Sequence, residues 1–195
     1  KKMQFKKLIR SDLSIYYMQD FSGKNFVIRK LLFLKAYFDV DFRVVFLYRI
    51  YSYLYTGKLK QIAILLYFRV KSRYAMDIHP TSNIGEGFRL MHGFNIAIGP
   101  DVKIGKCCKI FNGVTLGKAR PDNEQILMPE VGNFCILGTG AKILGKRKIK
   151  DCSIVGANHV TRKIKDNLVD QDPLIREVAK DYVNKMKEVL RILKD

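Results

Sequence analysis

Large aliphatic residues recur every six positions through the middle of this 195-residue chain, from about Asp77 to Ile164. A period of six matches neither the 3.6-residue turn of an α-helix nor the two-residue alternation of a β-strand. A solenoid explains it, because each short strand contributes one inward residue before the chain turns. The residues of this recurrence are Ile78, Ile84, Leu90, Ile98, Ile104, Ile110, Leu116, Val131, Leu137, Ile143, Ile149 and Val155.

A second position in each repeat also fits a solenoid. Four residues after most of these aliphatic residues lies a residue that is mostly smaller or apolar, and we expect it to point inward. These positions hold Ser82, Phe88, Phe94, Val102, Cys108, Val114, Cys135, Ala141 and Ser153. Gly often follows the aliphatic residue directly, which suits turns that need a positive φ. The pattern predicts a mainly β protein with some α-helix, built around a parallel β-helix.

Two departures interrupt the repeat. Eight residues, instead of six, separate Leu90 from Ile98. Residues 117–130 then break the pattern with a largely polar stretch that contains Pro121. An insertion into a solenoid forms a loop that projects from one face and is often functional.

The segments on either side of the repeat have helical patterns. Residues 1–75 contain helix-like apolar groups with breaks at Gly23 and Gly57, which predicts three or four helices. From Asp172–Pro173 onward an apolar stripe predicts a second helical segment. The predicted domains are an α-helical segment at 1–75, a β-helix at 76–166 with a loop at 117–130, and a C-terminal helix at 167–195.

The chain is strongly basic, with a net charge of +18 and a pI of about 9.8. An excess of this size favours an anionic partner such as a membrane surface, a phosphorylated ligand or nucleic acid. Nucleic acid is the weakest of these candidates, because no recognised binding motif accompanies the charge. In residues 1–75 the cations alternate with aromatic residues. This pattern fits either a helical domain buried within an oligomer or an amphipathic surface resting on an anionic membrane.

Cysteine usage and hydropathy indicate the compartment. The four cysteines form no Cys-x-x-Cys pair and suggest neither a disulfide framework nor a metal site. No apolar run reaches the roughly 18–20 uncharged residues of a membrane span, and no apolar segment of a signal peptide follows the basic amino end. We therefore expect a cytoplasmic protein, in a reducing compartment, that could contact the inner face of the plasma membrane.

Several motifs resemble those of a known family. They are Asp-Ile-His-Pro at 77–80, Ile-Gly-Glu-Gly at 84–87, His-Gly at 92–93, Val-Thr-Leu-Gly at 114–117 and Gly-Thr-Gly-Ala-Lys-Ile-Leu-Gly at 138–145. In order and spacing they resemble the hexapeptide-repeat acyltransferases, and within them the serine acetyltransferase branch. The likeness covers about residues 70–165. It implies a left-handed β-helix, acetyl-CoA as donor, and a homotrimer or dimer of trimers with active sites between neighbouring β-helices.

His92 and Asp77 match the catalytic pair of that family. Transfer of an acetyl group from a thioester to a hydroxyl needs a base for the hydroxyl proton, and histidine suits this role because its unperturbed pKa lies near 6.5. A carboxylate on the far ring nitrogen fixes the tautomer and stabilises the imidazolium. The two residues are fifteen positions apart, which should place them on successive coils. Without the resemblance, both would be assigned to ordinary turns.

The resemblance also implies a donor site. The pantetheine arm of CoA would lie along backbone amides near Gly117, Lys118, Thr139 and Ala157. The later coils are rich in Lys and Arg, which form either a solvated face or an attraction for the CoA phosphates.

The part of the family pattern that binds serine is altered. An Asp precedes the catalytic His in the serine enzymes, and Met91 stands there instead. An Arg-His-Pro of their later loop aligns with Leu127-Met128-Pro129. Charged partners for an amino acid are thus lost, which favours an apolar acceptor pocket at Met91 and Met128 and a sugar hydroxyl, as in enzymes that acetylate capsule or O-antigen polysaccharides. The alternatives are a divergent serine O-acetyltransferase and a non-catalytic, membrane-associated β-helix subunit.

Overall fold

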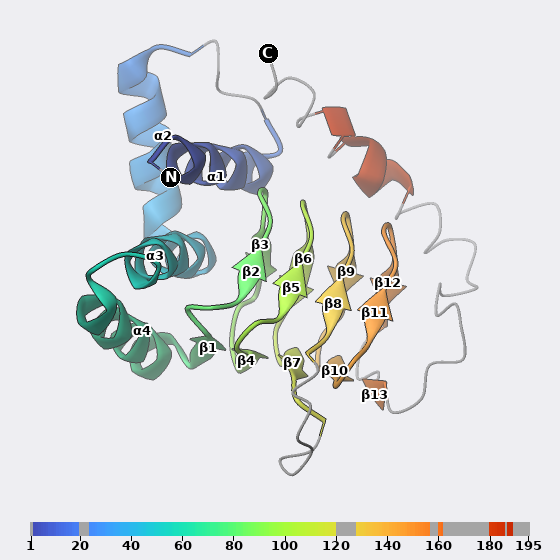
Figure 1. Cartoon of the computed structure of the whole chain (residues 1–195). Helices are drawn as coiled ribbons and strands as arrows, with labels where there is room; N and C mark the ends of the chain where they lie inside the picture. Colours follow the sequence, from blue (N-terminus) through green and yellow to red (C-terminus); the bar gives the residue numbers. More distant parts are fainter. Residues whose placement is uncertain are drawn as a thin grey trace.

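The chain folds into four helices followed by a stack of short parallel strands (Figure 1). The computed structural model describes residues 2–19, 24–119, 128–156, 160–161, 180–185 and 187–188. The helices lie together at one end of the stack, as Figure 1 shows. Their bounds are α1 Lys2–Tyr17, α2 Phe26–Phe38, α3 Val40–Tyr55 and α4 Lys60–Tyr74.

The strands form three parallel sheets that wind as a β-helix. The sheets have the orders β1-β4-β7-β10-β13, β2-β5-β8-β11 and β3-β6-β9-β12, so each coil contributes one strand to each sheet. The strands are β1 Met76–Ile78, β2 Asn83–Ile84, β3 Arg89–Met91, β4 Ile96–Ile98, β5 Lys103–Ile104, β6 Lys109–Phe111, β7 Thr115–Gly117, β8 Glu130–Val131, β9 Ile136–Leu137, β10 Lys142–Leu144, β11 Lys148–Ile149, β12 Ile154–Val155 and β13 Val160–Thr161. The predicted fold class is confirmed.

The six-residue recurrence supplies the core. Every aliphatic residue of the recurrence is buried, and so are the smaller or apolar residues four positions later, with one exception. Phe94 is 63% exposed. The expectation for Phe94 was wrong, because the two extra residues before β4 lengthen the turn and Ile96 takes the buried place instead.

Close packing between coils explains the glycines that follow the aliphatic residues. A Cβ on Gly85 would lie 2.7 Å from the backbone of Gly105, and one on Gly105 would lie 2.6 Å from the backbone of Gly132. None of these three has a positive φ. The expectation that they serve left-handed turns was therefore wrong; they are needed because the coils approach each other closely at this corner.

Helix α3 covers the open end of the β-helix. Four of its side chains donate hydrogen bonds to backbone carbonyls of the first coil, which has no preceding coil to pair with. The bonds run from Tyr48 to Ser82 (2.6 Å), from Arg49 to Ile84 and Gly85 (2.5 Å each), from Tyr51 to Ile78 (2.7 Å) and from Ser52 to Pro80 (2.9 Å). Backbone carbonyls that the helix would otherwise bury without a hydrogen-bond partner are thus satisfied.

A buried ion pair joins α1 and α3 to the first coil. Arg49 Nε lies 2.9 Å from Asp12 Oδ2, and both side chains are almost fully buried. Asp12 also accepts the backbone N–H of Phe88 at 2.9 Å. Burial raises the pKa of Asp12, and Arg49 acts against that rise. Removing either partner would leave an uncompensated buried charge.

The C-terminal part packs on the β-helix where it is described. Residues 180–185 and 187–188 are helical, with Tyr182 and Val183 buried. Tyr182 donates a hydrogen bond to the carbonyl of Cys107 at 3.0 Å. The predicted start of this helix at Asp172–Pro173 lies outside the described residues, and the division at 76–166 and 167–195 stays a prediction. Among the described helices, none is both long and apolar enough to span a bilayer.

Candidate functional site

His92 lies in the lengthened turn between β3 and β4. Its side chain is exposed, and its backbone has a φ of 53°, in the left-handed region that non-glycine residues seldom occupy. Asn95 in the same turn has a φ of 51°. Cys107, Phe134 and Cys152 have similar φ values in regular turns of the repeat, so a positive φ alone does not distinguish this turn. Its two extra residues and the imidazole that it presents to solvent do.

Asp41, near the amino end of α3, binds the backbone of the His92 turn. Its Oδ1 accepts the backbone N–H of Gly93 at 2.7 Å. Burial raises the pKa of Asp41, and the N–H groups of Gly93 and His92 act against the rise. A Cβ on Gly93 would lie 2.6 Å from both Asp41 Oδ1 and the Met76 methyl. The turn is thus packed against a half-buried carboxylate that belongs to another element.

Asp77 lies in the middle of β1 and is held by α4. Its Oδ1 accepts a hydrogen bond from Tyr67 at 2.5 Å, and its Oδ2 forms an ion pair with Lys71 at 2.6 Å. Burial and the bond to Asp77 both raise the pKa of Tyr67. Within the part of the chain that the structure describes, no hydrogen bond or ion pair joins Asp77 to His92. The pairing of the two residues stays a prediction.

Two of the predicted donor-site regions lie at opposite edges of the β1-β4-β7-β10-β13 sheet. Thr139 lies at the edge where these parallel strands begin, which is also the edge of His92. Asn112, in the turn of the coil between them, holds the Thr139 turn: its carbonyl accepts the N–H of Gly140 and its side chain accepts the Thr139 hydroxyl at 3.1 Å. Gly117 and Lys118 lie at the edge where the strands end. Ala157 is outside the described residues.

The two methionines of the predicted acceptor pocket are likewise separated. Met91 ends β3 beside His92 and is half-buried. Met128 lies near the end of the inserted loop, at the other edge, where it packs on the core and lies 3.8 Å from a Cβ built on Gly99. One chain therefore does not bring Met91 and Met128 together. Leu127 lies outside the described residues.

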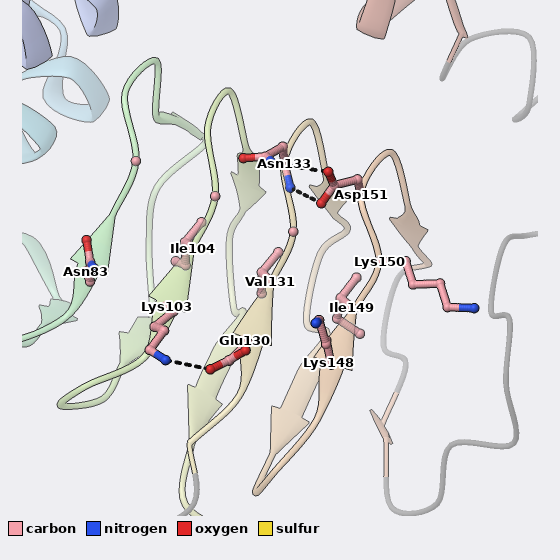
Figure 2. Close-up of a pocket in the computed structure, with 13 residues that line it drawn as sticks. Asn83, Lys103, Ile104, Glu130, Val131, Asn133, Lys148, Ile149, Lys150 and Asp151 are labelled. Carbon is pink, nitrogen blue, oxygen red and sulfur yellow. Dashed lines mark hydrogen bonds and ion pairs between the residues drawn. The ribbon is translucent and has the colours of Figure 1, made fainter.

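A shallow pocket opens on the outer face of the β2-β5-β8-β11 sheet (Figure 2). Its row of outward residues contains the ion pair between Lys103 and Glu130 at 2.7 Å. Near the next corner Asp151 accepts hydrogen bonds from the backbone and side chain of Asn133. None of the predicted site residues lines this pocket. Exposed pairs of this kind stabilise a fold only slightly, and we assign the pocket to the surface of the scaffold.

Sequence reasoning missed three residues that contact the candidate pair: Asp41, Tyr67 and Lys71. Asp41 is separated from Gly93 by 52 residues, so no local spacing connects them. Tyr67 and Lys71 are four residues apart on α4 and precede Asp77 by ten and six positions. The i, i+4 spacing that places both on one helical face could have pointed to them.

Known proteins with a similar sequence are serine acetyltransferases. The chain is 32% identical over 139 residues to the serine acetyltransferase of Buchnera aphidicola subsp. Acyrthosiphon pisum, covering 71% of the chain and 49% of that protein. It is 38% identical over 115 residues to a probable serine acetyltransferase of Oryza sativa subsp. japonica, covering 59% and 31%. The chain thus spans about half the length, or less, of these curated relatives. No family model matches it.

Solved structures with a similar fold are also serine acetyltransferases. The enzyme from Brucella abortus strain S19 superposes with a TM-score of 0.65 at 27% identity, over 82% of this chain and 62% of that one. The same enzyme in complex with coenzyme A superposes with a TM-score of 0.65 over 80% and 60%. A serine acetyltransferase in complex with cysteine reaches 0.67 at 27% identity, over 81% and 63%. The β-helix of this chain therefore has the fold of the left-handed β-helix in these solved serine acetyltransferases.

Proposed function

We propose that the protein is an acetyl-CoA-dependent O-acetyltransferase in which His92 is the general base. The observation that carries this proposal is the strained, exposed turn of His92, which Asp41 holds through Gly93. The similarity to serine acetyltransferases supports it. In the motif resemblance given above, His92 matches the base of that family.

The proposed reaction is a direct transfer. His92 removes the proton of the acceptor hydroxyl as its oxygen attacks the thioester carbonyl. The tetrahedral intermediate then expels the CoA sulfur, which takes the proton back from the imidazolium. The acceptor gains an acetyl ester and CoA leaves as the thiol, so atoms and charge balance.

Asp77 is proposed to orient His92 and to stabilise the imidazolium. In this structure the Asp77 carboxylate is bound to Tyr67 and Lys71 instead. The contact would therefore form when substrates bind, as catalytic hydrogen bonds often do. Until then, Tyr67 and Lys71 of α4 hold the carboxylate in place.

Acetyl-CoA is proposed to bind where two chains meet. Thr139 shares an edge with His92, whereas Gly117 and Lys118 occupy the opposite edge. A neighbouring copy could bring its own Gly117 edge to the His92 edge of the first chain, which fits the trimer or dimer of trimers that the resemblance implies. Ala157 completes the proposed donor contacts. A similar enzyme was solved in complex with coenzyme A, which supports acetyl-CoA as the acetyl donor.

Serine is the first candidate acceptor. The similar proteins are serine acetyltransferases, and one was solved in complex with cysteine, an amino acid of serine's shape. The half-buried carboxylate of Asp41 accepts the N–H of Gly93 in the His92 turn, so an acidic side chain lies next to the place where an ammonium group would have to bind. Serine acetylation is therefore the better supported assignment.

A sugar hydroxyl, including one on a capsule or O-antigen polysaccharide, is the second candidate. Met91, beside His92, is the observation that favours it, because an apolar side chain occupies the position of an acidic one in the serine enzymes. Met128 would add a second apolar surface if a neighbouring chain supplied it. A sugar carries no charge that these methionines would leave unpaired.

A thiol-release assay with acetyl-CoA separates the candidates. Serine and a panel of glycans are compared as acceptors by kcat/KM, and mass spectrometry locates the acetyl group on the product. His92→Ala should abolish turnover of the preferred acceptor while the protein stays folded. His79→Ala is the control, since His79 lies at the opposite edge of the sheet, just after β1, is bonded to Thr81 and has no proposed role in catalysis. Full activity in His92→Ala would exclude His92 as the base.

A further inference from the structure

Helix α2 turns an apolar stripe toward solvent. The stripe consists of Val27, Leu31, Leu34 and Phe38, whose side chains are 62%, 60%, 52% and 73% exposed. Their 4-3-4 spacing places them on one face of the helix. The opposite face is the packed one, where Ala36 is fully buried. A contiguous apolar stripe on an outer helix marks a surface that contacts something else.

The charges of α2 are all positive. Arg29, Lys30 and Lys35 are its charged side chains at neutral pH, and no acidic residue occurs between Phe26 and Phe38. Lys30 and Lys35 lie on either side of the stripe by helical spacing, and Lys30 also lies 4.5 Å above the Phe26 ring. Long cationic side chains in this arrangement can extend toward phosphates while their stems lie on apolar surface.

At both ends of α2, side chains bond to backbone groups that the helix itself leaves unpaired. At the amino end Asn25 accepts the N–H of Ile28 at 2.9 Å. At the carboxyl end Arg43 donates to the carbonyls of Tyr37 and Phe38 at 2.7 and 2.8 Å. A helix that enters a medium of low polarity needs such partners at its ends, because water cannot provide them there.

We propose that α2 docks on the surface of an anionic lipid bilayer. Its apolar stripe would enter the boundary between headgroups and acyl chains, and Lys30 and Lys35 would contact lipid phosphates. The helix has 13 residues, so it would lie along the surface for about 20 Å. In Figure 1 α2 lies among the helices at one end of the stack, away from the later coils, so docking there leaves those coils uncovered. This inference does not depend on the proposed function.

Charge complementarity favours lipid over a second copy of the chain. The 4-3-4 spacing would also suit a helix pair, but pairing two copies of α2 through the stripe would bring four lysines together with no acidic partner within either helix. The nearest acidic residue, Asp39, already caps α3 and accepts a hydrogen bond from Tyr16. An anionic bilayer supplies the missing negative charge.

Vesicle co-sedimentation tests the proposal. The full chain is mixed with phosphatidylglycerol-containing vesicles or with pure phosphatidylcholine vesicles, at low salt and at about 0.5 M salt, where charges are screened within a few ångströms. We expect binding to the anionic vesicles alone, and weaker binding at high salt. Leu31→Gln combined with Leu34→Gln should lower the affinity about tenfold or more, since two apolar anchors are lost. Lys30→Gln with Lys35→Gln should also weaken binding and reduce its salt dependence.

The matched control is a double substitution on α4, Ile62→Gln with Leu65→Gln. These residues are exposed to a similar degree, 49% and 70%, and lie outside α2. The control should bind vesicles like the unmodified protein, and circular dichroism should show all variants folded. Two results would overturn the proposal. One is equal vesicle binding by the α2 variant and the unmodified protein. The other is a smaller assembly for the α2 variant in the absence of lipid, by light scattering, which would assign the stripe to a second copy.

Discussion

Removing the Asp41 carboxylate should impair catalysis as well as stability. Its bond to the Gly93 N–H is charge-assisted, and such bonds contribute about 1.5–3 kcal/mol. Part of this is offset by the cost of burying the charge, which is why burial raises the pKa of Asp41. We therefore expect Asp41→Ala to lower the free energy of unfolding by only about 1–2 kcal/mol.

The effect on His92 follows from its backbone. A left-handed conformation costs a non-glycine residue roughly 1–2 kcal/mol, and the Asp41 bond is what opposes that cost in this turn. Without the bond the turn would leave the competent conformation most of the time. Since 1.4 kcal/mol corresponds to a tenfold change in population, kcat/KM should fall about tenfold to thirtyfold.

Steady-state kinetics with acetyl-CoA, together with urea unfolding, provide the measurement. Asp41→Asn should lose less activity than Asp41→Ala, because its amide oxygen can still accept the Gly93 N–H. Asp39→Ala is the matched control: it removes the cap of the same helix, where Asp39 accepts the Asp41 N–H at 2.8 Å, at a cost of about 1 kcal/mol. Unchanged kcat/KM in Asp41→Ala, or an equal loss in Asp39→Ala, would refute the argument.

Three further predictions concern the scaffold. Gly105→Ala should lower the urea midpoint of unfolding strongly, because its Cβ would meet backbone at 2.6 Å, whereas Gly156→Ala, with nothing within 4 Å, should leave it nearly unchanged. Arg49→Ala should lower the free energy of unfolding by about 3–5 kcal/mol in the same assay, since Asp12 would remain buried without its partner. A loss as small as that expected for an exposed ion pair, about 1 kcal/mol or less, would contradict this. Burial tends to raise the pKa of Glu86, but its two lysine partners outweigh burial and lower it, so this residue contributes stability above its unfolded pKa that disappears as the pH falls through the folded pKa. Glu86→Gln should therefore flatten the loss of unfolding free energy between about pH 5 and pH 3, and an unaltered acid limb would exclude this role.

The fold could be predicted because its main signal is periodic. A six-residue recurrence determines which side chains point inward, and the aliphatic residues of the recurrence are indeed all buried. The prediction failed at Phe94 for a local reason. Two inserted residues change the register within one turn, and the period says nothing about which residue then returns to the core.

The candidate site was predictable only in part. His92 and Asp77 could be named from motifs, but their surroundings come from the helices, which carry no motif of the family. Asp41 reaches the His92 turn across 52 residues, and α4 reaches Asp77 from a helix whose sequence shows only amphipathic groups. Contacts between elements so far apart depend on how helices pack on the first coil, and packing of that kind leaves little trace in local sequence.

The hydrogen bonds from α3 to the first coil have a consequence for assembly. A β-helix ends in a row of strand edges that could accept the edge of another chain, and such rows are templates for polymerisation. Tyr48, Arg49 and Tyr51 occupy that row with side-chain donors, so it cannot pair with a second solenoid. A chain deprived of its helices would expose the row and should stack end to end into filaments. The helices would thus prevent the β-helices of different chains from polymerising end to end.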